Sequence, residues 1–366
     1  GALLSGGVDS TTVVALMQRL SDRPVKTFSI GFSERKFNEA EHAAAVAAHL
    51  GTDHHELYVT PEQCLAVVDR LPDVFDEPFA DISHVPTLLV AQMARQGVTV
   101  VLAGDGGDEL FGGYSHYFEA LAQWQRMQQT PALVRRALRG CASGFAAANW
   151  RLVSGALTRA GRLPAWARFG AKLDKATRGW TGDTPQQLML ERFARIERPA
   201  DLVVGCQSVQ SGMTDAANWL SVDAPLLQMR HLDFIGYLPG DILVKVDRAS
   251  MSVGLEARCP ILDRRVVEFA WSLPESYLLD ASGGKRILRG VMAKYVRITG
   301  HVRGTAAASP IHNGILGMAT MKSTTRIMTS LLPSASRSAK RLPQNWVAPS
   351  PSQRLMTLLG KSPASV

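Results

Sequence analysis

Two patterns of apolar and polar positions alternate along the first hundred residues. Short continuous apolar runs predict buried strands, and longer stretches with apolar residues on one face predict helices. The predicted strands lie at residues 2–4, 25–32, 54–58 and 98–103. The predicted helices lie at residues 11–20, 39–50, 61–71 and 85–96. This alternation predicts an α/β fold with a doubly wound parallel sheet, whose ligands bind beyond the carboxyl ends of the strands.

The pattern changes after residue 116. From residue 117 to about 230, Ala, Leu, Arg, Gln and Trp dominate and strand signals disappear. We therefore expect a large helical insertion there. Residues 231–295 also predict mostly helix, but they carry dense polar motifs. Together these parts predict one catalytic domain over residues 1–296, with a helical C-terminal part.

The net charge of +8 lies in the last 70 residues, which contain nine Lys or Arg and no Asp or Glu. Residues 1–296 are therefore close to neutral, and we expect no nucleic-acid partner. Residues 297–366 are rich in small and hydroxyl side chains and lack periodic patterning. We expect either a disordered basic tail or a reading frame lost near Val296, and we favour the second. Comparison of the DNA in its other frames would test this.

Composition limits the class of protein further. A hydrophobic fraction of 46% supports a packed core. No apolar run approaches the ~20 residues that a membrane-spanning helix needs, so we expect no membrane partner. The four cysteines are scattered without a CxxC pair, which is typical of free thiols in a reducing cytoplasm.

A phosphate-binding loop is predicted directly after the first strand, in the sequence LLSGGVDS at residues 3–10. Gly6 and Gly7 permit a tight turn, and the N–H groups of the following helix start face any ligand above it. Ser5 and Ser10 add hydroxyl donors. Asp9 suits an anion site only if a cation intervenes, which predicts Mg²⁺ between Asp9 and the phosphates. The alternative, an ordinary helix N-cap, does not explain the two glycines.

A second loop, GDGGDELFGGY at residues 104–114, follows the last of these strands. It places Asp105 and Asp108 on a flexible glycine-rich backbone beside the first loop. Such carboxylates repel one another unless a metal or a cationic group separates them. The alternatives are a solvated acidic turn and a calcium loop, but the spacing of the acids does not match an EF-hand.

The motif SGGVDS resembles the SGGxDS loop of the ATP pyrophosphatases. Four further motifs follow in order: DEPFADIS (76–83), AGDGGDELFGGY (103–114), KVDRASM (245–251) and LEARCPILD (255–263). Together they resemble glutamine-hydrolysing asparagine synthetase over roughly residues 1–295. This resemblance implies that the chain activates aspartate with ATP and Mg²⁺ as β-aspartyl-AMP, which ammonia converts to asparagine. A homodimer is an option that the sequence leaves open.

The same resemblance implies roles for individual residues. The residues implied to bind ATP are Leu3, Ser5, Gly6, Gly7, Asp9, Ser10, Ile30, Ala103 and Gly104. Asp9 and Asp108 would bind Mg²⁺. Asp105, where the family often has Glu, would accept a proton from the attacking ammonia.

Five charged residues in the later motifs are implied to frame the aspartate side: Lys245, Asp247, Arg248, Glu256 and Arg258. Of these, Lys245 and Arg258 are the candidates for catalysis. A structural salt-bridge network is the alternative.

The sequence departs from the family in three places. The family begins with a glutaminase domain led by a cysteine, which this chain lacks, so we expect that domain upstream or on another fragment. Ala103 replaces a frequent Ser. After the segment that carries Gly284, Lys285, Leu288 and Arg289, we find no K-x-G-F loop with its pyrophosphate-binding lysine. We therefore expect ATP binding with slow turnover. Two alternatives stay open: a β-lactam-synthetase-like ring closure, and an impaired remnant that still binds ATP.

Overall fold

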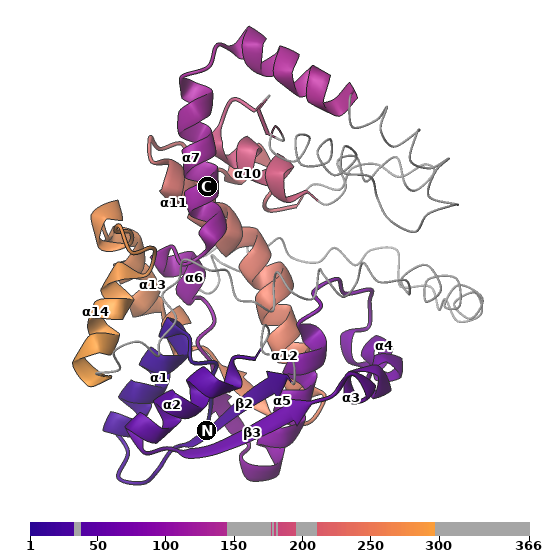
Figure 1. The fold of residues 1–366 in the computed structure, drawn as a ribbon, viewed down its shortest axis with the longest axis vertical. Coiled ribbons are helices and arrows are strands. Elements are labelled where there is room, and N and C mark those ends of the chain that lie inside the picture. Colours follow the sequence, from indigo (N-terminus) through magenta and orange to yellow (C-terminus); the bar gives the residue numbers. More distant parts are fainter. Residues whose placement is uncertain (33–37, 145–176, 178, 181, 195–210, 297–366) are drawn as a thin grey trace, which may run out of the picture. The chain divides into compact units, whose positions relative to one another are not determined.

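The computed structural model describes residues 1–32, 38–144, 177, 179–180, 182–194 and 211–296 (Figure 1). The chain divides into two compact units, one formed by residues 1–114 together with 237 onwards, and one by residues 115–236. The predicted tail at 297–366 and Cys206 lie outside the described residues. No helix in the described ranges is long and apolar enough to cross a membrane.

The first unit contains a parallel sheet in the order β3-β2-β1-β4-β5. Its strands are β1 (Ala2–Leu3), β2 (Lys26–Phe32), β3 (Asp53–Val59), β4 (Val100–Leu102) and β5 (Glu256–Arg258). The predicted α/β class and parallel sheet are confirmed.

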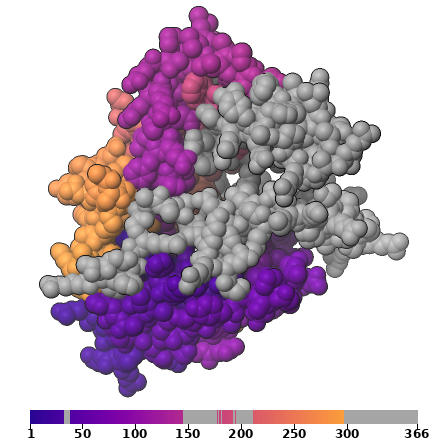
Figure 2. Space-filling model, viewed as in Figure 1, coloured from indigo at the N-terminus to yellow at the C-terminus, as the bar shows by residue number. Residues whose placement is uncertain are grey.

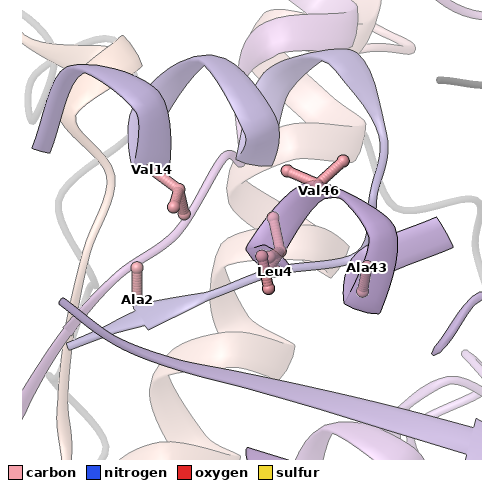
Figure 3. Packing of buried hydrophobic residues seen from close by; sticks show 6 residues of the cluster. Ala2, Leu4, Val14, Ala43 and Val46 are labelled. Atoms are coloured by element: carbon pink, nitrogen blue, oxygen red, sulfur yellow. The ribbon is translucent and has the colours of Figure 1, made fainter. Parts of the chain in front are cut away.

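Helices cover both faces of this sheet, because successive strand side chains point to opposite sides. Ala2 and Leu4 pack with Val14, Ala43 and Val46 on the face covered by α1 (Val8–Arg19) and α2 (Ala40–Leu50) (Figure 3). Leu3, between them, packs on the other face against a cluster that includes residues of α5 (His84–Gly97). The sheet is therefore doubly wound.

The other α-helices in the described part of the first unit are α3 (Pro61–Ala66), α4 (Leu71–Phe75), α6 (Gly107–Phe111), α12 (Leu243–Met251), α13 (Arg264–Ser272) and α14 (Arg286–Tyr295). Three 3₁₀ turns accompany them: Val68–Arg70, Pro260–Leu262 and Glu275–Tyr277. α14 packs against α1 although the two are far apart in the sequence. In Figure 2 the orange residues of this C-terminal part adjoin the indigo residues of the N-terminal part.

One predicted helix needs correction. Residues 61–71 were expected to form one helix, but the helix ends at Ala66 and a new one begins at Leu71. Pro72 lies in the first turn of α4, where its missing N–H costs nothing, whereas it would break a continuous helix. Residues 231–295 are mostly helical, as expected, and they also contain the short edge strand β5, which pairs with β4 from Val100 to Leu102.

The described part of the second unit is helical. It contains α7 (Ser115–Gln128), α10 (Pro185–Phe193), α11 (Pro225–Leu232) and a 3₁₀ turn at Ala216–Asn218. The three α-helices pack on one another, and Asp233 accepts a hydrogen bond of 2.7 Å from the Tyr117 hydroxyl. A π-helix follows at Asp233–Ile242, and the division between the units falls within it. Much of the predicted insertion at 117–230 lies outside the described residues, so its extent stays a prediction.

Candidate active site

The reversal of strand order places the candidate site. From β1 the chain builds outward through β2 and β3, and it later returns to the other side of β1 with β4. In such sheets the crevice beyond the carboxyl ends of the two strands at the reversal is where ligands bind. The segments that follow β1 and β4 are the two loops identified from sequence.

The first loop is folded tightly onto itself. Gly6 has φ +75°, and a Cβ there would lie 2.9 Å from the Ala43 backbone nitrogen. The Ser5 and Ser10 hydroxyls are 2.9 Å apart, and the Ser5 N–H donates to Ser10 Oγ at 3.2 Å. Gly7 is the N-cap of α1 and has no side chain to cap the helix. The first N–H groups of α1 therefore suit an anion.

Glycines bring the second loop against the first. A Cβ on Gly104 would lie 2.6 Å from the Ser10 nitrogen, and one on Gly107 would lie 2.3 Å from Asp9 Oδ1. Neither position has room for a side chain. The loop was expected to have a flexible backbone, but residues 107–111 form the short helix α6. This helix carries Asp108 in its first turn.

Asp9 and Asp108 converge on one lysine ammonium. Lys285 Nζ donates to Asp9 Oδ2, and it forms an ion pair of 2.8 Å with Asp108 Oδ1. The Lys285 side chain is only 5% exposed, against 14% for Asp9 and 31% for Asp108. One positive charge thus faces two carboxylates and compensates one of them, so the group keeps a net charge of −1.

Burial and charge shift the pKa values of this group. Burial raises the pKa of Asp9 to about 6; the ammonium of Lys285 opposes the shift and the neighbouring Asp108 adds to it. Burial alone would lower the pKa of Lys285, but Asp108 and Asp9 outweigh it and hold the pKa above its ordinary value. Lys285 is therefore charged at neutral pH.

The group fits a magnesium ion bound together with phosphate. Asp9 Oδ1 is buried and has no hydrogen-bond partner in the described structure, and the group has a surplus negative charge. Among the described residues no cluster of three or more His, Cys, Asp or Glu side chains could hold a metal alone. Magnesium in nucleotide sites is usually held by one or two carboxylates, with phosphates and water completing the shell.

Asp105 lies in the same loop between Lys245 and Cys259. Burial raises its pKa, and the charge of Lys245 opposes that shift. The Cys259 thiol donates to Asp105 Oδ2 at a sulfur–oxygen distance of 3.9 Å. Burial and the Asp105 charge raise the pKa of Cys259 to about 12, so the thiol stays protonated.

Lys245 is held by a buried ion pair. Its Nζ donates to Asp81 Oδ2 at 2.6 Å and to Ser83 Oγ at 2.8 Å. Burial would raise the pKa of Asp81, but Lys245 and the Ser83 hydrogen bonds outweigh it and hold the pKa well below its usual range. The ion pair with Asp81 matches the alternative that Lys245 belongs to a structural salt-bridge network. The Lys245 charge also partly offsets the rise that burial causes in the pKa of Asp105.

The other charged residues of the later motifs point elsewhere. Arg258 and Glu256 form an exposed ion pair of 2.8 Å on β5, although the Arg258 carbonyl accepts a hydrogen bond from the Ala103 N–H. Arg248 pairs with Asp76 at 3.3 Å on the surface. Asp247 lines a cavity of about 360 Å³ that also reaches Cys259.

Leu3 and Ile30, the predicted adenosine contacts, lie on the adjacent strands β1 and β2. Both pack against the apolar cluster that contains Phe28 and Val101. Their contact with a nucleotide stays a prediction.

Sequence reasoning missed the roles of Lys285 and Asp81. Both residues lie in motifs identified from the sequence, but no function was assigned to either of them. The two glycines before Lys285 were the available signal, because they allow a backbone to approach another loop closely. Nothing in the spacing of the DEPFADIS motif indicated that Asp81 meets Lys245.

Comparison with known proteins finds a matching family and several similar proteins. The family described as asparagine synthase matches residues 1–334, which extends beyond the resemblance noted from the motifs. A Mycobacterium tuberculosis protein named "Putative asparagine synthetase (glutamine-hydrolyzing)" is 34% identical over 303 residues, covering 81% of this chain and 42% of that protein.

Two further relatives show the same similarity. Asparagine synthetase (glutamine-hydrolyzing) 1 of Bacillus subtilis is 28% identical over 302 residues, 81% of this chain and 44% of that protein. Asparagine synthetase B of Escherichia coli is 32% identical over 139 residues, 33% of this chain and 24% of that protein. The chain spans about two fifths of the length of the first two relatives.

Proposed function

The chain belongs to the asparagine synthase family, and on this premise we propose that it catalyses the ATP-dependent conversion of aspartate to asparagine. The observation that carries the proposal is the convergence of Asp9 and Asp108 on Lys285 Nζ. It joins two glycine-rich loops at the reversal point of a parallel sheet, where nucleotides bind.

ATP is held by the first loop in this proposal. The N–H groups at the start of α1 and the hydroxyls of Ser5 and Ser10 bind its phosphates. Magnesium, held by Asp9 and Asp108, supplies positive charge that stabilises the departing pyrophosphate. Lys285 is then free to pair with phosphate oxygens, so the cation that neutralises the carboxylates in the nucleotide-free protein serves the nucleotide in the complex.

The reaction has two steps. A β-carboxylate oxygen of aspartate attacks the α-phosphorus of ATP, which forms β-aspartyl-AMP and releases pyrophosphate. Ammonia then attacks the β-carbonyl carbon, the bond to the AMP oxygen breaks, and asparagine and AMP leave. Asp105 takes the surplus proton of the attacking nitrogen. Its raised pKa, caused by burial, makes it a stronger base than an exposed aspartate.

Glutamine is the proposed source of the ammonia. The relatives' names state that they hydrolyse glutamine. We assign that hydrolysis to a domain other than the one described here, which receives ammonia, aspartate and ATP. A homodimer and a cytoplasmic location remain predictions from the sequence.

The comparisons favour this reaction over the alternatives. The matched family and the names of the relatives specify asparagine synthesis, not ring closure. The contacts among Asp9, Asp108 and Lys285 hold the two loops together, and this supports an active enzyme over a remnant without chemistry. The sequence after Tyr295, where no K-x-G-F loop was found, lies from residue 297 onwards outside the described residues, so the expected slow turnover stays a prediction.

AMP formation tests the proposal. The full chain is incubated with ATP, Mg²⁺ and aspartate, with and without ammonium, and AMP and asparagine are quantified. We expect aspartate-dependent ATP–pyrophosphate exchange without ammonium, and asparagine with it. Asp9→Asn should reduce exchange by about a hundredfold or more, whereas Asp53→Asn, in an exposed pair with His55, should leave it unchanged. ATP binding without any AMP would refute the proposal.

A further inference from the structure

Lys285 reaches the carboxylates from an unfavourable backbone conformation. Its φ of 58° and ψ of 30° lie in the left-handed region, which only one other non-glycine residue, Asp76, enters in the described parts of the chain. Such a conformation is unfavourable for a residue that carries a Cβ and persists only where the surroundings impose it. The contacts on either side of Lys285 therefore decide where its ammonium lies.

A closed turn precedes Lys285. The Asp280 and Gly283 backbones exchange two hydrogen bonds of 3.0 Å. The Asp280 carboxylate accepts from the Ser282 N–H at 2.8 Å and from the Ser282 hydroxyl at 2.5 Å. Asp280 thus fixes both the backbone and the side chains of the turn.

Arg289 ties this turn to the helix that follows. Its Nη2 donates to both carboxylate oxygens of Asp280 at 2.6 Å and to Ser282 Oγ at 2.8 Å. Its backbone N–H donates to the Lys285 carbonyl at 2.9 Å, so it lies one helical turn beyond Lys285. The guanidinium therefore connects the segments before and after Lys285.

The opposite side of the segment rests on the second loop. The Lys285 N–H donates to the Phe111 carbonyl at 3.0 Å. A Cβ on Gly284 would lie 1.9 Å from the Gly112 oxygen, and one on Gly113 would lie 1.9 Å from Lys285 Cε. The lysine side chain thus passes directly over Gly113 to Asp9 and Asp108, with little room to shift.

We propose that Arg289 and Asp280 are positioning residues that hold Lys285 over the Asp9–Asp108 pair. This rests on the proposed function, in which Lys285 serves the phosphate site. We call the contacts between Arg289 and Asp280 the clamp. If the clamp opens, Lys285 relaxes from its left-handed conformation and withdraws from the carboxylates. The nucleotide-free protein then exposes two uncompensated carboxylates to metal ions, and the nucleotide complex loses a correctly placed cation.

Manganese binding without nucleotide is the first test, measured by electron paramagnetic resonance on the full chain. Lys285→Met should bind Mn²⁺ about tenfold more tightly than wild type, because the competing ammonium is gone. Arg289→Gln and Asp280→Asn should shift binding in the same direction. The matched control is Arg264→Gln, which breaks an exposed pair of 2.7 Å with Glu268 on α13 and should bind as wild type.

Exchange kinetics are the second test. Arg289→Gln should lower kcat of aspartate-dependent exchange by about a hundredfold, since small misplacements of a catalytic cation are costly. KM for aspartate should change little. Arg289→Lys, which keeps a cation for Asp280, should recover part of the rate. A purely structural role would lower thermal stability without tightening Mn²⁺ binding.

The outcomes separate the two proposals. If Lys285→Met gains Mn²⁺ affinity while the Arg289 and Asp280 variants stay at the wild-type value, the clamp is refuted and the proposed function stands. If Lys285→Met gains nothing, Lys285 does not occupy the metal position and the clamp is refuted as well. Absence of AMP from the wild-type chain would refute the proposed function, while Mn²⁺ binding would still decide on the clamp.

Discussion

Lys285 and Asp108 form an ion pair of 2.8 Å between the start of α14 and the first turn of α6. The lysine thereby lies at the point where two carboxylates were expected to share a metal. Its ammonium contacts both Asp9 and Asp108 and so links the two loops.

Removing this ammonium should weaken the fold in a way that metal repairs. We expect Lys285→Met to lower the free energy of unfolding by about 3 kcal/mol at pH 7, because two facing carboxylates lose their partner. Millimolar Mg²⁺ should restore part of the loss in the variant and have little effect on wild type. Urea denaturation with and without Mg²⁺ measures both effects. An equal response of the two proteins to Mg²⁺ would contradict the prediction.

Gly104→Ala should separate the two loops. The added Cβ would lie 2.6 Å from the Ser10 nitrogen, which is backbone and cannot move aside cheaply. We expect ATP affinity to fall by about tenfold or more, corresponding to at least ~1.4 kcal/mol. Gly290→Ala is the control, because that helical glycine has open space around it and alanine should stabilise α14 by up to about 1 kcal/mol. Calorimetric titration with ATP checks both variants.

The Cys259 thiol should resist alkylation in the folded chain. Its pKa is raised to about 12 by burial first and by Asp105 second, so very little thiolate exists at pH 8. Cys141 is exposed and should react with iodoacetamide before Cys64 and Cys259, as peptide mapping would show. Asp105→Asn removes the neighbouring charge and should accelerate labelling of Cys259 several-fold. Equal rates in the variant and wild type would show that Asp105 does not act on the thiol.

Asp280 should make stability depend on pH in the acid range. Hydrogen bonds from Ser282 and the charge of Arg289 hold its folded pKa at about 2, below the ~3.9 of an unfolded aspartate. A depressed pKa contributes stability above the unfolded value and loses it as the pH falls toward the folded one. The stability difference between wild type and Asp280→Asn should therefore be constant above about pH 5 and shrink between pH 4 and 2. Denaturation curves at several pH values test this, and a constant difference would contradict it.

Sequence reasoning was strongest where periodicity and glycine spacing carried the signal. The strands β1, β2 and β4 were recognisable from their apolar residues, β3 was predicted despite its polar sequence DHHELYV, and the parallel sheet followed from the alternation of strands with helices. β5 was missed because only three residues form it and two of them, Glu256 and Arg258, are exposed. Its pairing with β4 depends on a distant segment, which local patterns do not record.

The candidate site shows the same division. The loops after β1 and β4 could be placed together from topology alone. The partner of Asp9 could not be predicted, because Lys285 is 276 residues away in the sequence. It reaches Asp9 from a left-handed backbone conformation that no periodicity predicts. The charged motif residues were also ambiguous. The sequence patterns did not distinguish Lys245 from Arg258. In the structure Lys245 is buried against Asp81, whereas Arg258 is exposed on β5.

The pairing of β4 with β5 also sets an order of events during synthesis on the ribosome. β4 ends at Leu102, but the strand that covers its outer edge begins only at Glu256. Until that later segment emerges, the nascent chain exposes an unpaired strand edge directly beside the phosphate loop, and Lys285 has not yet been made. Exposed edges invite pairing with other chains. Nascent chains stalled between these two points therefore carry an exposed strand edge that favours aggregation.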